Sequence, residues 1–470
     1  MKYISTRGKV NKIGFIDTVL MGLATDGGLL VPEKIPQISK DKLDAMSNLS
    51  YQELAYEIIS YYVDGEIPEN ELKELIKKSY ETFRTPEVTP VVKLKENMYV
   101  LELFHGPTFA FKDVALQFLG NLYSYIAKKT GETINILGAT SGDTGASAIE
   151  GVRGKEGIRI CILHPHGKVS KVQELQMTTV DDESVLNLAI KGTFDDGQRI
   201  IKEIFADLDF KAQYHLRAIN SINFARILAQ TVYYFYAYFQ VAKEKDIKSL
   251  NFSVPTGNFG DIFAGYLAKR MGLPVGKLIV ATNENNILER FIKDGVYQPG
   301  EFHSTYSPSM DIQVASNFER YLYYLLKEDP SATSALMDQF KSEGKMTVTV
   351  EQLLRVQADF AAEGVQGEEC LKTISQYHKE TQYLLDPHTA CGIAAYETCN
   401  EQDQVCVTLS TAHPAKFNEA IQLCDIEQTY PEQIQALFDK PQYLEVVEAS
   451  NEDIRHQLEK HFRSTSSVEK

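Results

Sequence analysis

Short apolar runs alternate with glycine-containing polar loops along most of the chain, and apolar positions at helical spacing follow the loops. This order predicts buried strands that lead through loops into helices, which is typical of parallel sheets with helices packed on their faces. Ligands of such folds gather at the carboxyl ends of the strands. We expect strands at residues 99–104, 133–137, 158–163, 185–190, 250–254, 277–281 and 405–409.

The first 95 residues follow a different, mainly helical pattern. Ser50 and Glu53 are spaced as a capping box at a helix start, and a second helix is expected near Pro68. Prolines within residues 85–90 favour an extended linker, so we place a domain boundary near residue 95. The predicted parts are a helical domain at 1–95, an α/β core at 96–430 with a mainly helical insertion at 302–385, and a C-terminal helical tail at 431–470. Helices are expected in the insertion at residues 318–326, 332–340 and 350–360.

Composition limits the classes of function that remain. A chain of 470 residues with 43% hydrophobic and 24% charged residues is long enough for two or three globular domains. The net charge of −16 argues against general affinity for nucleic acid or anionic membranes, although it allows a local cationic pocket. We find no secretory signal and no apolar segment of membrane-spanning length. Six cysteines without a Cys-x-x-Cys pair favour reduced thiols in the cytoplasm over a disulfide framework or a metal site.

Lys112 lies where an expected strand gives way to a helix. Gly106 and Pro107 break the strand, and apolar residues recur at helical spacing from Lys112 onward. A lysine beside Phe109 and Phe111 at the positive end of a helix has reason to lose its proton, because burial and the helix dipole both disfavour the ammonium. A neutral amine can form a Schiff base with an aldehyde cofactor. Taken alone, however, the stretch better fits a lysine whose stem packs on the rings while its head reaches water.

Two loops are suited to holding anions. In Thr256-Gly-Asn-Phe-Gly260 the glycines let the backbone approach an anion, and the following helix offers free N–H groups and its positive end. A tight strand-to-helix turn without a ligand is the alternative. Thr140-Ser-Gly-Asp-Thr-Gly145 adds hydroxyls that suit a carboxylate or a phosphate. Asp143 does not fit an anion site, so it either caps the helix or meets a cofactor hydroxyl.

Two further stretches carry polar side chains at a helix start and at a strand end. Asn220, Ser221 and Arg226 introduce a long apolar helix, and the guanidinium can bind a phosphate or carboxylate through two hydrogen bonds. A solvated helix start with a surface arginine is the alternative. Thr411 and His413 follow the last expected strand. The Thr411 hydroxyl can reach a ring nitrogen in a cleft, whereas His413 is either a base or a hydrogen-bonded structural histidine.

Taken together, these stretches resemble the pyridoxal-phosphate enzymes of fold type II, the tryptophan-synthase-β type, and within them the longer-chain class of the threonine synthase family. Seven motifs carry the resemblance, and they occur in the family's order over residues 23–417. The motifs are Leu23-Ala-Thr-Asp-Gly-Gly-Leu-Leu-Val-Pro32, His105-Gly-Pro-Thr-Phe-Ala-Phe-Lys-Asp113, Gly138-Ala-Thr-Ser-Gly-Asp-Thr-Gly145, Asn220-Ser-Ile-Asn-Phe-Ala-Arg226, Thr256-Gly-Asn-Phe-Gly-Asp261, Ser307-Pro-Ser-Met-Asp-Ile312 and Thr411-Ala-His-Pro-Ala-Lys-Phe417.

The resemblance implies an α/β fold with two lobes built on parallel sheets, preceded by a mainly helical N-terminal extension. It also implies roles for the motif residues. The cofactor contacts would be the Schiff-base lysine Lys112, the phosphate loop Gly257, Asn258, Phe259 and Gly260, and the partner of the pyridine nitrogen, Thr411. The substrate contacts would be Thr140, Ser141 and Thr144 for the α-carboxylate, and Asn220, Ser221 and Arg226 for the phosphate. Fold type II enzymes commonly have Asn at the position of Asp143, which leaves the contact of Asp143 with the cofactor open.

The function implied by the resemblance is a pyridoxal 5'-phosphate-dependent lyase that converts O-phospho-L-homoserine and water to L-threonine and phosphate. We expect a cytoplasmic monomer or homodimer that binds a small-molecule substrate, no nucleic acid, no membrane and no metal. Two alternatives stay open. A related lyase would stop at elimination and release 2-oxobutyrate, ammonia and phosphate, and a non-catalytic relative would keep only the fold.

Overall fold

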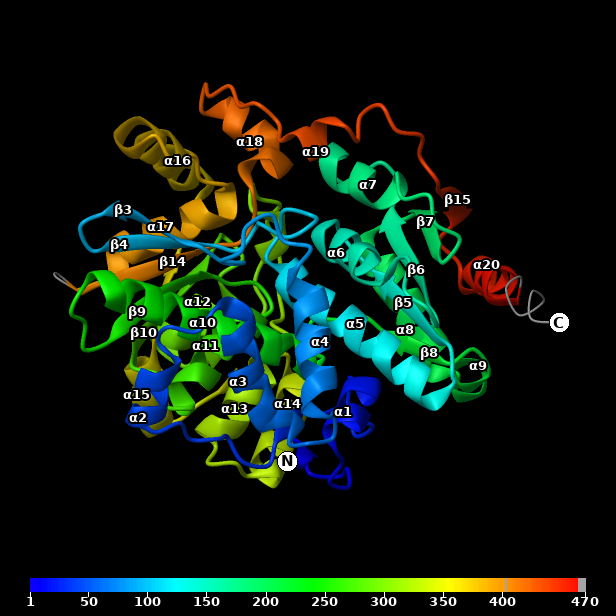
Figure 1. The fold of residues 1–470 in the computed structure, drawn as a ribbon, viewed down its shortest axis with the longest axis horizontal. Helices are drawn as coiled ribbons and strands as arrows, with labels where there is room; N and C mark the ends of the chain where they lie inside the picture. Colours follow the sequence, from blue (N-terminus) through cyan, green and yellow to red (C-terminus); the bar gives the residue numbers. More distant parts are fainter. Residues whose placement is uncertain (402–403, 464–470) are drawn as a thin grey trace. The chain divides into compact units, whose positions relative to one another are not determined.

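Two separate sheets contain the strands that the apolar runs predict. A computed structural model describes residues 1–401 and 404–463, which form two units (Figure 1). The first unit contains Met1–Lys77, Phe83–Phe111 and Ser221–Gln428. The second contains Lys78–Thr82, Lys112–Asn220 and the described residues from Thr429 onward. The chain therefore enters the second unit at Lys78, Lys112 and Thr429, and it returns to the first unit at Phe83 and Ser221.

The first unit is built on a six-stranded sheet with the strand order β13-β10-β9-β14-β4-β3. All neighbouring strands in it run parallel except the β3–β4 pair, which is antiparallel. Every residue of β9 and β14 is buried, which is expected for central parallel strands covered on both faces. The strands are β3 (Val91–Lys95), β4 (Met98–Glu102), β9 (Leu250–Pro255), β10 (Val275–Thr282), β13 (Phe360–Gly364) and β14 (Cys406–Ser410).

Helices pack against this sheet and around it. Helix α17 (Pro387–Cys399) packs against β9, β10, β13 and β14, and α11 (Gly260–Arg270) packs against β9 and β10. The long helix α10 (Phe224–Glu244) packs against α11 and against α3 (Tyr51–Val63) of the N-terminal region. Three further helices form most of that region: α1 (Phe15–Met21), α2 (Lys40–Met46) and α4 (Glu69–Tyr80).

The remaining elements of the first unit are short or peripheral. Two small antiparallel sheets pair β1 (Tyr3–Ser5) with β2 (Leu30–Pro32) and β11 (Val296–Tyr297) with β12 (Met346–Thr347). The helices are α12 (Ile287–Asp294), the 3-10 turn η1 (Pro308–Met310), α13 (Phe318–Leu325), α14 (Pro330–Glu343), α15 (Val350–Asp359), α16 (Gly367–Thr381), the 3-10 turn η2 (Pro414–Phe417) and α18 (Asn418–Leu423).

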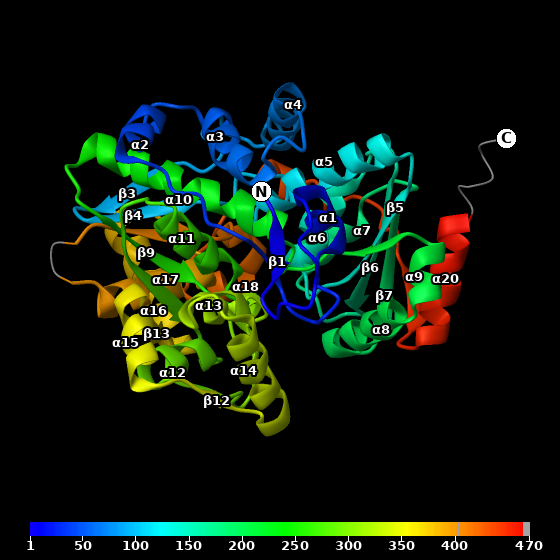
Figure 2. The same cartoon turned by 90° about the horizontal axis from the view of Figure 1, so that it is seen from below.

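The second unit is built on a five-stranded, fully parallel sheet with the order β15-β7-β6-β5-β8. Ile200, Ile204, Phe210 and Leu458 belong to one hydrophobic cluster with apolar residues of this sheet, so α8, α9 and α20 cover one face, while α5, α6 and α7 lie on the other (Figure 2). The strands are β5 (Ile134–Ala139), β6 (Ile158–Pro165), β7 (Val185–Lys191), β8 (Leu216–Ala218) and β15 (Glu445–Glu448). The helices are α5 (Lys112–Thr130), α6 (Asp143–Val152), α7 (Lys171–Thr178), α8 (Phe194–Ala206), α9 (Leu208–Gln213), α19 (Glu432–Gln435) and α20 (Asn451–Arg463).

Most of the predicted elements are present, with boundaries shifted by at most three residues. All seven strands exist, the capping box of Ser50 and Glu53 is formed, and a helix starts at Lys112. The helix predicted to end at residue 360 is wrong at its last residue, because the chain turns there into β13, the edge strand of the large sheet. The prediction also missed strand β15. The last seven residues of the predicted C-terminal tail lie outside the described residues.

The packing of α5 on α6 depends on two glycines. A Cβ atom at Gly120 of α5 would lie 1.9 Å from the carbonyl oxygen of Gly151 in α6, and one at Gly151 would lie 2.5 Å from the carbonyl oxygen of Leu116. Both obstacles are backbone atoms, which cannot move away by changing a side-chain rotamer. The two helices therefore approach each other as closely as they do because neither glycine carries a side chain.

We predict that Gly120→Ala lowers the free energy of unfolding by about 1–3 kcal/mol or more, because the added methyl group forces the two helices apart. Urea denaturation followed by circular dichroism measures this. Lys128→Ala on the exposed side of the same helix is the control, and it should change stability by no more than about 0.5 kcal/mol. An unchanged stability in Gly120→Ala would contradict the close helix packing.

Candidate functional site

The segment that leads into Lys112 pairs with the segment that carries Thr411. The Phe111 N–H donates to the Thr411 carbonyl oxygen (2.8 Å), and Ala110 forms an antiparallel bridge with Ala412. Phe109 in this segment has a positive φ of 61°, which is uncommon for a residue with a side chain. Lys112 is therefore the first helical residue after a segment that is fixed against the end of β14.

His413 lies on the same short segment and is a structural residue. Its Nδ1 accepts a hydrogen bond from the Ala415 N–H (3.1 Å), and its ring packs edge-on against Phe104 and Phe109. Burial, together with the nearby positive charge of Arg84, lowers the pKa of His413 to about 4. The imidazole is therefore neutral at physiological pH and too weakly basic to serve well as a general base, so the structural alternative left open by the sequence is the correct one.

The loop before α11 has the form of an anion cradle. Phe259 has a positive φ of 67°, and its ring packs on Phe318 at 5.1 Å between centroids. A Cβ atom at Gly257 would lie 2.7 Å from the Ser309 carbonyl oxygen, so only glycine fits there. The Gly260 N–H donates to the Asn258 side-chain oxygen (3.0 Å), which closes the turn. The first turn of an 11-residue helix follows directly, with backbone N–H groups that have no partner within the helix.

Asp261 follows this cradle, but its carboxyl group is turned towards two tyrosines of α10. Its Oδ1 accepts hydrogen bonds from the Tyr233 and Tyr234 hydroxyls, and within the described chain its buried Oδ2 has no partner. Burial raises the pKa of Asp261 from its ordinary value of 3.8 to about 7. A large fraction of the carboxyl group is therefore uncharged near neutral pH, which limits the negative charge close to the anion cradle.

Arg226 is buried in the first turn of α10. Only 3% of the residue is exposed, so the alternative of a solvated surface arginine is wrong. The preceding turn is fixed because the Asn223 side chain accepts from the Ala225 N–H (3.1 Å) and donates to the Val19 carbonyl oxygen (2.9 Å). A guanidinium held this deeply needs acceptors or an anion, since an uncompensated buried charge is costly.

Two buried residues that the sequence analysis did not single out connect these loops. The Asn317 N–H donates to the Asn258 carbonyl oxygen (2.9 Å), and its side-chain amide donates to the Ser221 carbonyl oxygen (3.1 Å). Arg320, one turn further along, donates to the Asn317 side-chain oxygen and to the Ile222 carbonyl oxygen, both at 2.5 Å. Asn317 is the N-cap residue of α13 (Phe318–Leu325) and Arg320 lies in its first turn, and their spacing in the sequence gives no signal of these distant contacts.

The second unit carries the loop before α6. The Thr140 hydroxyl oxygen accepts from the backbone N–H groups of Gly142 (3.0 Å) and Gly145 (2.9 Å), so this side chain shapes the loop from within. Asp143 is the first residue of α6, and its Oδ1 accepts from the Gln173 amide (2.9 Å). Because Gly142 occupies the capping position, the proposed capping role of Asp143 is wrong.

The residues predicted to form the site are divided between the two units. In the first unit, Asn317 connects the cradle to Ser221. Arg226 lies in α10, which packs against the helix that follows the cradle. The same unit carries Thr411. The second unit carries Lys112, Thr140, Ser141, Thr144 and Asn220. No helix of the described residues is long and apolar enough to cross a membrane.

Comparison with known sequences and structures identifies the family. Family descriptions match in three consecutive parts: "Threonine synthase N terminus" at residues 2–80, "Pyridoxal-phosphate dependent enzyme" at 82–411 and "Threonine synthase, C-terminal" at 389–458. The threonine synthase of Schizosaccharomyces pombe is 47% identical, with 90% of this chain and 89% of the relative covered. The chain belongs to the threonine synthase family.

Further relatives agree with this assignment. The threonine synthase of Saccharomyces cerevisiae is 48% identical over 89% of this chain and 88% of its own. A solved threonine synthase of Brucella melitensis with bound pyridoxal phosphate superposes with a TM-score of 0.95 at 42% identity, covering 98% of this chain and all of that one. The predicted family, fold type II, enzyme class and pyridoxal-phosphate dependence are confirmed.

We predict that Asp261 makes stability fall as the pH rises from about 4 to about 7. The unfolded carboxyl ionises near 3.8 and the folded one near 7, so the folded state holds a proton across this window that the unfolded state has released. The free energy of unfolding should therefore fall by about 1.4 kcal/mol per pH unit there, relative to an Asp261→Asn variant. Urea denaturation at several pH values measures the difference, and exposed Asp294→Asn is the control. Parallel pH profiles for the wild type and Asp261→Asn would contradict a raised pKa.

Proposed function

We propose that this protein converts O-phospho-L-homoserine and water to L-threonine and phosphate, with pyridoxal 5'-phosphate as cofactor. The observation that carries the proposal is the pairing of the Lys112 segment with the Thr411 segment. The Phe111–Thr411 hydrogen bond fixes the residue just before the proposed cofactor lysine to the backbone of the proposed ring-nitrogen partner. Membership of the threonine synthase family over nearly the whole chain supports the choice of reaction.

The residues present fit a bound pyridoxal phosphate. The cradle at residues 257–260 offers a position where no side chain fits, at Gly257, and the N-terminus of α11 for the phosphate group. Lys112 at the start of α5 supplies the amine that holds the cofactor covalently. The Thr411 hydroxyl would supply a neutral partner for the ring nitrogen. When bound, the cofactor supplies an electron sink for the carbanion chemistry at the substrate.

Lys112 also moves protons. The free amine of Lys112 would remove the Cα proton of the substrate and return protons at later steps. Phe109, Phe111 and the positive end of α5 favour the neutral amine that this role requires.

The substrate carries two anionic groups, and the chain offers a separate set of residues for each. We assign the α-carboxylate to Thr140, Ser141 and Thr144, where helix α6 begins with its N–H groups and hydroxyls. We assign the substrate phosphate to Asn220, Ser221 and Arg226, because the buried guanidinium suits a dianion better than any neutral group. Asp143 pairs with Gln173, and we assign it no contact with substrate or cofactor.

We also propose that the protein acts in the cytoplasm as a monomer or homodimer, with a small molecule as its substrate. All six cysteines are free thiols, which supports a reducing compartment. The domain boundaries near residues 95 and 430 stay proposals of the same kind.

A product assay tests the reaction. Purified protein incubated with pyridoxal phosphate and O-phospho-L-homoserine should release threonine and phosphate in equal amounts, measured by amino-acid chromatography and a phosphate assay. Predominant 2-oxobutyrate with ammonia would show a lyase that stops at elimination. Absence of any product, together with no cofactor absorbance band, would indicate a non-catalytic relative.

We predict that Lys112→Ala abolishes both the visible absorbance band of the bound cofactor and threonine formation, because the amine that holds the cofactor and moves the protons is gone. Absorbance after dialysis against pyridoxal phosphate and the product assay measure the two effects. Lys128→Ala, on an exposed turn of the same helix, is the matched control and should keep both. A retained band in Lys112→Ala would mean that another lysine holds the cofactor.

A further inference from the structure

The 3-10 turn η1 forms one wall of the anion cradle. The Ser309 carbonyl oxygen is the atom that a Cβ at Gly257 would meet at 2.7 Å, and the Met310 Cα would lie 3.4 Å away. The position of the Ser309 peptide unit therefore limits how the Gly257 backbone can lie. The proposed contacts with cofactor and substrate include no residue of this turn.

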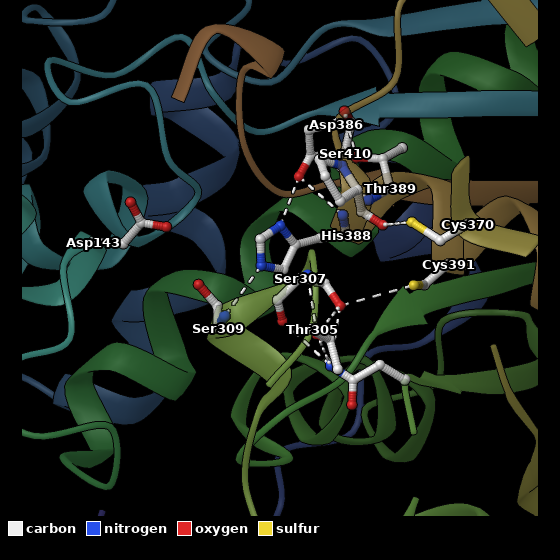
Figure 3. Close-up of polar contacts among 12 residues, drawn as sticks. Asp143, Thr305, Ser307, Ser309, Cys370, Asp386, His388, Thr389, Cys391 and Ser410 are labelled. Atoms are coloured by element: carbon white, nitrogen blue, oxygen red, sulfur yellow. Dashed lines mark hydrogen bonds and ion pairs between the residues drawn. The ribbon is translucent and has the colours of Figure 1, made fainter. Parts of the chain in front are cut away.

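His388 holds the other side of this turn. The Ser309 N–H donates to the His388 Nε2 (3.2 Å), as Figure 3 shows. An imidazole nitrogen that accepts a hydrogen bond carries no proton, so the ring proton must be on Nδ1. That nitrogen lies 2.7 Å from the Asp386 Oδ2, and the carboxylate accepts its hydrogen. The histidine is only 3% exposed, and its ring packs edge-on against Phe417.

Asp386 is itself fixed by several donors. It caps α17 by accepting from the backbone N–H groups of His388 (3.0 Å) and Thr389 (3.1 Å), and its Oδ1 also accepts from the Thr389 hydroxyl. That hydroxyl lies 3.0 Å from the Ser410 hydroxyl at the end of β14, next to Thr411 (Figure 3). A buried and fully bonded carboxylate of this kind holds the imidazole in one orientation and one tautomer.

We propose that His388 is a positioning residue for the cofactor-phosphate loop. Its Nε2 holds the Ser309 peptide unit against Gly257, and Asp386 supplies the orientation, so that the loop presents its N–H groups to the phosphate in one geometry. The proposal rests on the proposed function, since residues 257–260 are the proposed phosphate loop. His388 touches neither substrate nor cofactor in this role and acts only through the turn.

Substitution of His388 by Asn or by Gln distinguishes the roles of its two ring nitrogens. Asn places its amide near Nδ1 and keeps a donor for Asp386, whereas Gln reaches the position of Nε2 and can accept from Ser309. Loss of the acceptor removes the hydrogen bond that holds the half-buried Ser309 N–H, so the turn shifts and the cradle loses its shape.

The experiment measures dissociation constants of the apoprotein for pyridoxal 5'-phosphate and for pyridoxal, which lacks the phosphate. We expect His388→Asn to raise the dissociation constant for pyridoxal phosphate by about tenfold, the equivalent of about 1.4 kcal/mol, with that for pyridoxal unchanged. His388→Gln should bring the value for pyridoxal phosphate back to within about threefold of the wild type. Both ligands are measured on one preparation, so a reduced folded fraction does not change their ratio.

Two reference variants make the outcome decisive. His303→Asn changes an exposed histidine in the segment before η1 and should leave both constants unchanged. Gly257→Ala places a methyl group against Ser309 and should weaken binding of pyridoxal phosphate alone. If Gly257→Ala has no effect, the proposed phosphate loop itself is wrong. If Gly257→Ala weakens binding while His388→Asn does not, or weakens both ligands equally, the role of His388 is overturned. Where His388→Asn does not fold, His388→Met replaces it under the same criteria.

Discussion

The first unit depends on satisfying one buried guanidinium. Arg320 is fully buried, and burial lowers its pKa to about 9, so the group remains charged at neutral pH and must find acceptors inside the protein. It finds them in the Leu30 carbonyl, the Ile222 carbonyl and the Asn317 side chain, which belong to three segments far apart in sequence. Asn317 then extends the connection to the Asn258 carbonyl in the anion cradle. The N-terminal strand β2, the start of α10 and the cradle are thus held by one set of bonds, which explains why the N-terminal motif belongs to the same family pattern as the loops.

Elsewhere near the proposed anion contacts, titratable groups are kept largely neutral. Burial raises the pKa of Asp261 to about 7 and lowers that of His413 to about 4, so neither adds much charge at neutral pH. His388 accepts a hydrogen bond at Nε2 from the Ser309 N–H. Arg226 and Arg320 are buried cations of the same unit, and their charge favours an anion near the start of α10. A chain with a net charge of −16 can in this way still carry local positive charge in its interior.

The strands and loops that depend on a local sequence pattern could be predicted from the sequence. Apolar runs such as residues 158–163 are buried on both faces of a sheet, and the loops after them start helices, so strands and candidate loops could be placed by pattern alone. Strand β15 could not be found this way, because its four residues, Glu-Val-Val-Glu, are mostly exposed and contain too short an apolar run. Asn317, Arg320 and His388 were missed for a different reason. Each acts through contacts with residues tens to hundreds of positions away, and no spacing within a helix reports such contacts.

The family motifs lie far apart in the sequence because segments distant from Gly257 form the surroundings of the cradle. A loop of this kind needs a glycine only if something else occupies the space where a side chain would be, and at Gly257 the occupant is the Ser309 carbonyl, some fifty residues downstream. That turn is in turn held by His388, which lies on a helix leading to β14 and Thr411. A change at any one of these positions would have to be matched at the others to keep the same loop geometry. Residues 307–312 therefore belong to the family pattern because of the geometry they impose on Gly257, even though no side chain of theirs is assigned to the chemistry.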